Sequence, residues 1–194
     1  MEIIKIERKV LAKNDAIASE IRGKFEKNGV FAVNMVSSPG SGKTSLVEKI
    51  IEYFSGRVNI SVIEGDVQTD LDAQRVSAYN VPVVQIITNG GCHLEANLVN
   101  DSLKNLDLVQ TDLLIIENVG NLVCPAGYDL GEDMKIVVIS VTEGDDKPLK
   151  YPKMFINSRV LVINKTDLLP YVNCNIEQLK QNALKINPRL KVFE

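Results

Sequence analysis

The chain is 194 residues long with 45% hydrophobic and 24% charged residues, which is typical of one folded domain and disfavours disordered or fibrous proteins. Its 22 lysines and arginines against 25 aspartates and glutamates leave a net charge of −3, so binding to nucleic acid or to an anionic membrane has no electrostatic support. No apolar stretch approaches the ~18–20 residues that span a bilayer, the start lacks the apolar region of a signal peptide, and three cysteines are too few for a disulfide framework, so we expect a cytoplasmic protein.

The first thirty residues (1–30) are predicted to be an N-terminal helical segment. Within it, residues 7–28 should form an amphipathic helix that ends at Asn28-Gly29. The apolar side chains of its buried face recur at nearly helical spacing: Val10, Ile17, Ile21 and Phe25.

The rest of the chain, residues 31–194, is predicted to be a single domain. Short β-branched runs alternate there with helical patterns: 31–36, 58–63, 81–86, 112–117, 135–140 and 159–164. Their continuous apolar character suits strands covered on both faces, and the segments between them are long enough for crossover helices. The predicted fold class is therefore α/β, a doubly wound, mostly parallel sheet with helices on both faces. In such a sheet ligands bind beyond the carboxyl ends of the strands.

A phosphate-binding loop is predicted directly after the first run, where SSPGSGKT (37–44) precedes a helical pattern. Glycines let backbone N–H groups close around phosphate oxygens, Lys43 can reach the β- and γ-phosphates, and the Thr44 hydroxyl can ligate Mg²⁺. Ser37 replaces the first glycine of the G-x-x-x-x-G-K-[ST] pattern, but the strand-loop-helix context favours a P-loop NTPase over a chance glycine-rich turn. The predicted phosphate-binding residues are consecutive: Gly40, Ser41, Gly42, Lys43, Thr44 and Ser45.

The segment NKTD (164–167), after the sixth run, indicates which base is bound. The Asp167 carboxylate can accept hydrogen bonds from N1–H and the N2 amino group of guanine, whereas adenine has no N1–H and carries its amino group elsewhere. Lys165 would lie along the base, and Asn164 would brace the loops. A polar turn can carry the same letters, but after a phosphate loop in register they predict a GTP-binding domain with GTP and GDP as ligands.

Glu117 and Gly120, in the segment ENVG after the fourth run, are predicted to lie at the γ-phosphate. Many GTPases have Asp-x-x-Gly at this place, with a backbone N–H that meets the γ-phosphate, so Glu117 would hold Mg²⁺ through water. Asn121 follows Gly120 where a glutamine would be expected in a fast hydrolase. We therefore expect slow intrinsic GTP hydrolysis and a switch-like cycle.

Three carboxylates follow the second run: Asp66, Asp70 and Asp72. Asp66 would lie near the γ-phosphate and either orient the attacking water or bind Mg²⁺, so Asp66 and Lys43 are the predicted catalytic residues. At least two of the three carboxylates are expected to be solvated residues of a turn and a helix start. The predicted Mg²⁺ ligands come from three different loops: Thr44, Asp66 and Glu117.

A second metal site is predicted from Cys92, His93 and Cys124. Cys92 and His93 follow the third run and Cys124 follows the fourth, so both segments begin at the carboxyl edge of the sheet. Thiolates and an imidazole suit Zn²⁺ or Ni²⁺, and a helix start at Cys92 would favour its thiolate. Three ligands leave a tetrahedral ion incomplete, so the fourth would come from water or from a second protomer. The alternative is two buried cysteines and a helix-capping histidine; Cys174, near the last helical pattern, is expected to be structural.

These motifs occur in one order and spacing: SSPGSGKT, IEGDVQTDLDAQR, GGCHLEANLV, ENVGNLVCPAGYDLGE, VTEGDDKP and NKTD. In this combination the sequence resembles, from about residue 8 onward, the HypB family of hydrogenase nickel-incorporation GTPases, of the group that includes the signal-recognition-particle and nitrogenase iron-protein NTPases. The resemblance implies a GTP- or metal-dependent homodimer. It would deliver nickel to the large-subunit precursor of [NiFe]-hydrogenase together with a HypA-type metallochaperone. It also implies that Cys92, His93 and Cys124 hold Ni²⁺ or Zn²⁺ at or near the dimer interface.

Two departures from that family limit what the resemblance implies. Residues 1–30 contain neither cysteine nor histidine, so a second, tight nickel site or a nickel store is not expected here. The family's chain normally continues past the last strand into a Ser-x-Lys loop behind the guanine base, whereas this sequence stops at Glu194. We therefore expect the sequence to be cut short, with weaker guanine binding and an uncovered sheet edge as consequences.

The predicted mechanism is a loaded switch in which GTP and Mg²⁺ order the loops after Asp66 and Glu117. Because Cys124 lies on the second of these loops, the nucleotide should alter the metal site, and nickel should alter GTP affinity in return. The first alternative is a urease accessory GTPase, against which the Cys92-His93 adjacency argues. Two others are a GTP-binding metal carrier without significant hydrolysis and a small-molecule kinase, which lacks identifiable acceptor residues.

Overall fold

The computed structural model describes residues 6–194, with side chains from residue 11 onward. The side chain of Val10 and the first residues of the N-terminal segment therefore lie outside the described residues. Within the described part, no helix combines the length and the apolar character needed to cross a membrane.

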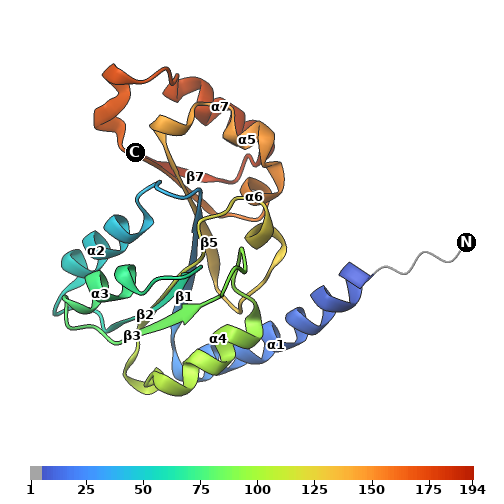
Figure 1. Ribbon diagram of the computed structural model, residues 1–194, viewed down its shortest axis with the longest axis vertical. Helices are drawn as coiled ribbons and strands as arrows, with labels where there is room; N and C mark the ends of the chain where they lie inside the picture. The colour runs from blue at the N-terminus through green and yellow to red at the C-terminus, as the bar shows by residue number, and fades with distance from the viewer. Residues whose placement is uncertain (1–5) are drawn as a thin grey trace, which may run out of the picture.

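A parallel seven-stranded sheet forms the centre of the molecule, in the order β3-β2-β4-β1-β5-β6-β7 (Figure 1). The strands are β1 (Phe31–Ser37), β2 (Ile60–Asp66), β3 (Val83–Ile87), β4 (Leu113–Glu117), β5 (Met134–Ser140), β6 (Val160–Asn164) and β7 (Lys191–Phe193). The six predicted runs correspond to β1 through β6, so the doubly wound, parallel fold class is confirmed. The short strand β7 was not predicted, because three residues cannot show a strand pattern.

Helices cover both faces of this sheet. The α-helices are α1 (Ile6–Asn28), α2 (Lys43–Phe54), α3 (Leu71–Ser77), α4 (Ala96–Ser102), α5 (Lys147–Lys150), α6 (Pro152–Ile156) and α7 (Ile176–Ile186). Short 3₁₀ turns complete the connections: η1 (Leu103–Asn105), η2 (Leu108–Gln110), η3 (Cys124–Gly127), η4 (Val141–Glu143) and η5 (Thr166–Tyr171). Side chains of α2 and α3 pack on one face, and those of α1, α4, α6 and α7 pack on the other.

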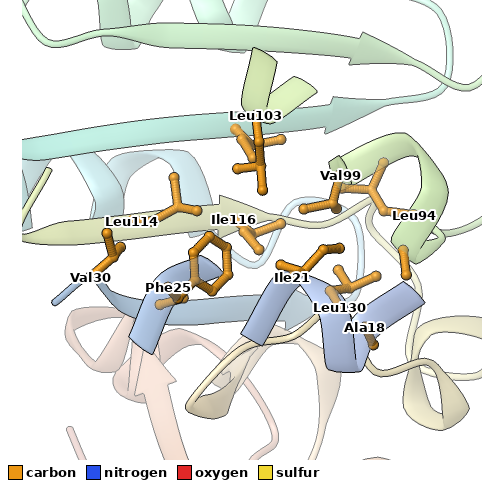
Figure 2. Close-up of a cluster of buried hydrophobic side chains, with 13 residues drawn as sticks. Ala18, Ile21, Phe25, Val30, Leu94, Val99, Leu103, Leu114, Ile116 and Leu130 are labelled. Atoms are coloured by element: carbon orange, nitrogen blue, oxygen red, sulfur yellow. The ribbon is translucent and has the colours of Figure 1, made fainter. Parts of the chain in front are cut away.

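Helix α1 is part of this core, as its amphipathic pattern predicts. Ile21 and Phe25 are at most 2% exposed and pack against Leu114 and Ile116 of β4 (Figure 2). The helix ends at Asn28, and Gly29 follows with φ +72°, the left-handed conformation that commonly terminates a helix. The predicted helix over residues 7–28 is therefore confirmed for the described residues.

The strand order places β1 and β4 side by side in the middle of the sheet. Their carboxyl ends carry the phosphate loop and the ENVG segment, respectively. Because all strands run in the same direction, the loops after β2, β3 and β6 reach the same edge of the sheet. Every predicted site residue lies at this edge.

Candidate functional site

The phosphate loop connects β1 to α2. Gly40 and Gly42 have φ values of +73° and +93°, a conformation that glycine adopts without steric cost. A Cβ on Gly42 would lie 2.4 Å from Asn164 Nδ2, and that amide donates to the carbonyl oxygen of Ser41 at 2.8 Å. The loop is thus held from behind by the segment after β6.

Lys43 and Thr44, at the start of α2, converge on Glu117. Thr44 Oγ1 donates to Glu117 Oε1 at 2.9 Å, and Lys43 Nζ lies 3.8 Å from the same oxygen while donating to Ser37 Oγ at 2.8 Å. Among the described residues, Ser41 Oγ and Glu117 Oε2 are buried without a hydrogen-bond partner. An ammonium, a hydroxyl and a carboxylate with an unused oxygen at a helix N-terminus fit a triphosphate and its Mg²⁺.

Glu64 is a second buried carboxyl beside Glu117, and the sequence analysis did not identify it. The two residues are opposite each other in the register of β2 and β4, and Glu64 is only 2% exposed. Burial, together with the charge of Glu117, raises the pKa of Glu64 to about 10. Burial also raises the pKa of Glu117 to about 7, although Lys43 and Thr44 oppose this. The pair therefore retains a proton at neutral pH until a cation reaches it.

Asp66, at the end of β2, differs from this pair because it is ionised at neutral pH. Its Oδ1 accepts hydrogen bonds from the backbone N–H groups of Gln68 at 2.9 Å and Thr69 at 2.7 Å. Burial alone would raise the pKa of Asp66, but these hydrogen bonds bring it below its usual value. Asp66 is thus a charged carboxylate at the rim of the site.

A cavity of about 430 Å³ lies in front of the phosphate loop. It is lined by Pro39, Gly40, Gly42, Lys43, Thr44, Ser45, Asp66, Val67, Asp72, Arg75, Glu117, Val119, Gly120 and Lys165. The structure therefore brings together most of the predicted phosphate and Mg²⁺ residues. Arg75 was missed by the sequence analysis; its guanidinium lies 2.9 Å from Glu48 Oε2, which holds it beside the cavity. Only its place within the segment IEGDVQTDLDAQR could have drawn attention to it.

The NKTD segment lies against the phosphate loop. Lys165 has φ +60°, and its Nζ donates to the carbonyl oxygen of Gly40 at 2.7 Å. The Asn164 side chain accepts from the backbone N–H of Lys165 at 2.9 Å while it contacts Ser41. Asp167 is exposed in the first turn of η5, next to these contacts and outside the cavity lining.

The predicted metal ligands form a compact cluster. The ligand atoms of Cys92, His93 and Cys124 all lie within 4.8 Å of one another, and Cys92 Sγ is 3.5 Å from His93 Nδ1. The neighbouring Cys92 thiol, together with burial, raises the pKa of Cys124. A bound cation would replace these thiol protons, because thiolates are the metal-binding form.

One expectation about this cluster is wrong. Helix α4 begins at Ala96, so Cys92 lies in the preceding loop and no helix N-terminus favours its thiolate. Asn89 and Gly90, with φ values of +51° and +100°, form a turn that delays the start of the helix. Cys174 packs against the hydrophobic cluster around β5 and β6, as expected of a structural residue.

His93 is held as a neutral ligand by its surroundings. Its ring lies 4.0 Å from the Tyr128 ring, centroid to centroid, and burial lowers the pKa of His93. Its Nε2 is buried without a hydrogen-bond partner among the described residues, 3.8 Å from Glu95 Oε1. With Nδ1 toward Cys92, the ring presents one nitrogen to the cluster and the other to a carboxylate, a common arrangement of histidine ligands.

Asn121 contacts the turn that carries Cys124 and does not line the cavity. Its Oδ1 accepts from the backbone N–H groups of Val123 at 2.7 Å and Cys124 at 3.3 Å. Its Nδ2 donates to Cys124 Sγ at 3.6 Å. The residue in the place of a water-orienting glutamine therefore shapes the turn that carries Cys124.

Known proteins match this chain over nearly its full length. The family model described as CobW/HypB/UreG, nucleotide-binding domain, matches residues 31–194. Hydrogenase maturation factor HypB of Rhizobium leguminosarum bv. viciae is 53% identical over 191 residues, which are 98% of this chain and 64% of that relative. Hydrogenase/urease maturation factor HypB of Helicobacter hepaticus is 42% identical, over 98% of this chain and 79% of the relative. The chain thus spans less than two thirds of the first relative's length.

A solved structure agrees with these sequence matches. The crystal structure of HypB from Helicobacter pylori in complex with nickel has a TM-score of 0.89 and 42% identity, and it covers 93% of this chain and 85% of that one. The same fold and substantial sequence identity therefore occur together over most of the chain. The chain belongs to the CobW/HypB/UreG family, among the HypB maturation factors.

Proposed function

We propose that this protein is a GTP-hydrolysing metallochaperone that inserts nickel into [NiFe]-hydrogenase precursors. The observation that carries the proposal is the convergence of Cys92, His93 and Cys124 within 4.8 Å, at the same sheet edge as the phosphate loop. The relatives named as hydrogenase maturation factors, and the nickel complex of one of them, support nickel as the cargo.

GTP occupies the cavity in front of the phosphate loop in this proposal. Loop residues 40–45 and Gly120 surround the phosphates, Lys43 neutralises their charge, and Asp167 recognises guanine with Asn164 and Lys165 as supports. Mg²⁺ is held by Thr44, Asp66 and Glu117 in this proposal. The Thr44–Glu117 hydrogen bond at 2.9 Å and the unpartnered Glu117 Oε2 support this role for two of them.

Hydrolysis is slow in this proposal and gives GDP and phosphate. Asp66 lines the cavity as an anion, so it can orient the attacking water or bind Mg²⁺. Asn121 is engaged by the turn at Cys124 and does not line the cavity. The residue directly after Gly120 therefore does not position water as a glutamine would.

The metal is passed on from an open site. Two thiolates and one imidazole bind Ni²⁺ and also Zn²⁺, which competes for the same donors. A fourth ligand from water or from a second protomer makes the site easy to load and unload, and a homodimer supplies the second option. We propose a HypA-type metallochaperone as the donor or helper and the hydrogenase large-subunit precursor as the recipient. Free thiols fit the reducing conditions of the cytoplasm.

A urease precursor is a second candidate recipient. The name of the Helicobacter hepaticus relative includes urease as well as hydrogenase. The recipient does not change the chemistry of the metal site, so both candidates share the same first test.

That test is a nickel titration of the wild-type protein, of Cys124→Ala and of Cys174→Ala, in GDP and in a non-hydrolysable GTP analogue. We expect wild type and Cys174→Ala to bind Ni²⁺ with a thiolate charge-transfer absorption, and Cys124→Ala to lose both. The sedimentation mass should change with nucleotide or metal, and phosphate release should be slow but measurable. Nickel binding that ignores Cys124 would refute the metal site, and a flat phosphate-release assay would leave a carrier without hydrolysis.

A further inference from the structure

A row of buried polar side chains crosses the sheet behind the site, on the face opposite helix α2. It consists of Asn118, Asn34, Glu132 and Lys135, here called the buried polar network. Asn34 and Asn118 are at most 1% exposed and Lys135 is 6% exposed. Polar groups at such depth are costly unless each is hydrogen-bonded, so their arrangement is strongly fixed.

One end of the network holds the loop that carries Cys92 and His93. Asn118 Oδ1 accepts from the backbone N–H of Leu94 at 3.0 Å, the residue directly after His93. Leu94 is itself fully buried, and a Cβ on Gly65 would lie within 3 Å of its side chain. A displacement of Asn118 would therefore be transmitted to the His93 loop.

The other end holds the turn that carries Cys124. Asn118 Nδ2 donates to Asn34 Oδ1 at 3.2 Å, and Asn34 Nδ2 donates to Glu132 Oε1 at 3.1 Å. Lys135 Nζ lies 3.7 Å from Glu132. The network thus runs without a break from β4 across β1 to β5.

Lys135 connects the network to the segment that carries Cys124 and Tyr128. Its Nζ donates to the carbonyl oxygens of Pro125 and Tyr128, each at 3.0 Å. Pro125 follows Cys124 in η3, and the ring of Tyr128 lies against His93. The buried ammonium therefore fixes the turn that positions Cys124 and the aromatic neighbour of His93.

The backbone at the end of β4 connects the network to the residues of the phosphate loop. Glu117 faces Lys43 and Thr44, while the next residue, Asn118, reaches Asn34 and Leu94 on the other face, as expected for successive residues at a strand end. Two residues after Asn118, Gly120 lies against the phosphate loop, since a Cβ on Gly120 would lie 3.0 Å from Pro39 Cα. A nucleotide or Mg²⁺ that moves Glu117 or Gly120 must therefore move Asn118.

We infer that the buried polar network couples the nucleotide site to the ligand cluster of Cys92, His93 and Cys124. Asn34 and Lys135 act in it as positioning residues. This inference rests on the proposed function, because it assumes that nucleotide changes metal affinity. The competing route is the covalent one, in which residues 119–124 alone carry the change from Glu117 to Cys124. The two routes differ in whether residues outside that segment affect the coupling.

The experiment measures the ratio of Ni²⁺ affinities in GDP and in a non-hydrolysable GTP analogue. Two variants interrupt the network at separate places: Asn34→Val at its centre and Lys135→Met at its end. Ser61→Ala is the matched control, because it removes the buried hydroxyl pair of Ser61 and Thr111, at 2.8 Å, which belongs to the same sheet but not to the network. Circular dichroism checks folding, and the thiolate absorption checks that the nickel ligands are retained.

We expect a wild-type ratio of about 5-fold or more, in the range of ordinary allosteric couplings. Asn34→Val and Lys135→Met should each bring the ratio close to one while GDP affinity stays unchanged, and Ser61→Ala should keep the wild-type ratio. If one variant does not fold, the other still decides, because the two interrupt the network at different places. Variants that fold and keep the wild-type ratio would overturn the inference in favour of the covalent route. A ratio of one in the wild-type protein would instead refute the coupling in the proposed function, and the network's role with it.

Discussion

At the scale of single residues, the phosphate loop depends on a close contact between Gly42 and Asn164. The glycine has φ +93°, and a Cβ there would lie 2.4 Å from Asn164 Nδ2. The same amide donates to Ser41 and belongs to the segment that we assign to guanine. One substitution at this position therefore tests the phosphate and base sides together.

Gly42→Ala should lower GDP and GTP affinity by about 10-fold or more, because a left-handed alanine is strained by about 1–2 kcal/mol and also displaces Asn164. Fluorescent-nucleotide titration measures this effect. Gly56→Ala is the control, since Gly56 has a similar φ of +69° with nothing within 4 Å of an added Cβ. Its strain should lower stability without changing nucleotide affinity. Equal affinity losses in the two variants would contradict the proposed contact.

The buried carboxyl pair Glu64 and Glu117 predicts a pH dependence of the nucleotide-free protein. Their pKa values lie near 10 and 7 in the fold, against the usual 4.5. The folded state therefore binds more protons than the unfolded state above pH 4.5. The free energy of unfolding should then fall as pH rises from about 4.5 to about 10, with the share of Glu117 complete near pH 7. The fall is up to ~1.4 kcal/mol per pH unit for each retained proton.

Glu64→Gln should flatten this dependence, because glutamine stays neutral in both the folded and unfolded states. Urea denaturation at pH 5, 6, 7 and 8, without nucleotide or Mg²⁺, compares it with the wild type and with the exposed control Glu20→Gln. The control should keep the wild-type slope. A Glu64→Gln protein with the same slope as wild type would show that the pair does not retain the proton.

At the scale of elements, α1 is built into the domain rather than attached to it. Its Ile21 and Phe25 pack on β4. Asn14 links the segments that follow His93 and Cys124, since it accepts from Ala96 N–H at 2.8 Å and donates to the carbonyl oxygen of Asp129 at 2.8 Å. The predicted N-terminal segment (1–30) and the predicted domain (31–194) therefore pack against each other through α1.

Ile21→Ala should therefore destabilise the whole protein by about 2–5 kcal/mol, the usual cost of a large buried truncation. The measurement is a urea transition followed by both far-UV circular dichroism and tyrosine fluorescence. Glu20→Ala, on the exposed side of the same helix, should change stability by less than about 0.5 kcal/mol. An early, separate transition of α1 with the rest unchanged would argue for an independent segment.

The elements also show what the sequence can and cannot predict. The phosphate loop and NKTD were predicted because their spacing is local and fixed, and β1 to β6 because each is a continuous run of mostly apolar residues. The contact of Asn34 with Glu132 depends on the register of β1 against β5. The buried position of Glu64 beside Glu117 likewise depends on the pairing of β2 with β4. The helix start near Cys92 was misplaced because the Asn89-Gly90 turn postpones it.

At the scale of the whole molecule, the proposed nucleotide and metal sites share one edge of one sheet. At the end of β4, Glu117 contacts Lys43 and Thr44 of the phosphate loop, while the next residue, Asn118, holds Leu94 beside His93. We therefore propose that the two sites rearrange together. Thermodynamic linkage then requires that nickel change GTP affinity by the same factor by which GTP changes nickel affinity. In the proposed function, this reciprocity is how the nucleotide controls the metal site.

The most direct test is a calorimetric titration of the wild-type protein with a non-hydrolysable GTP analogue and Mg²⁺, with and without saturating Ni²⁺. We predict affinities that differ by about 5-fold or more, and no difference in Cys124→Ala. Equal affinities with and without nickel, in a wild-type protein that binds both ligands, would contradict the account.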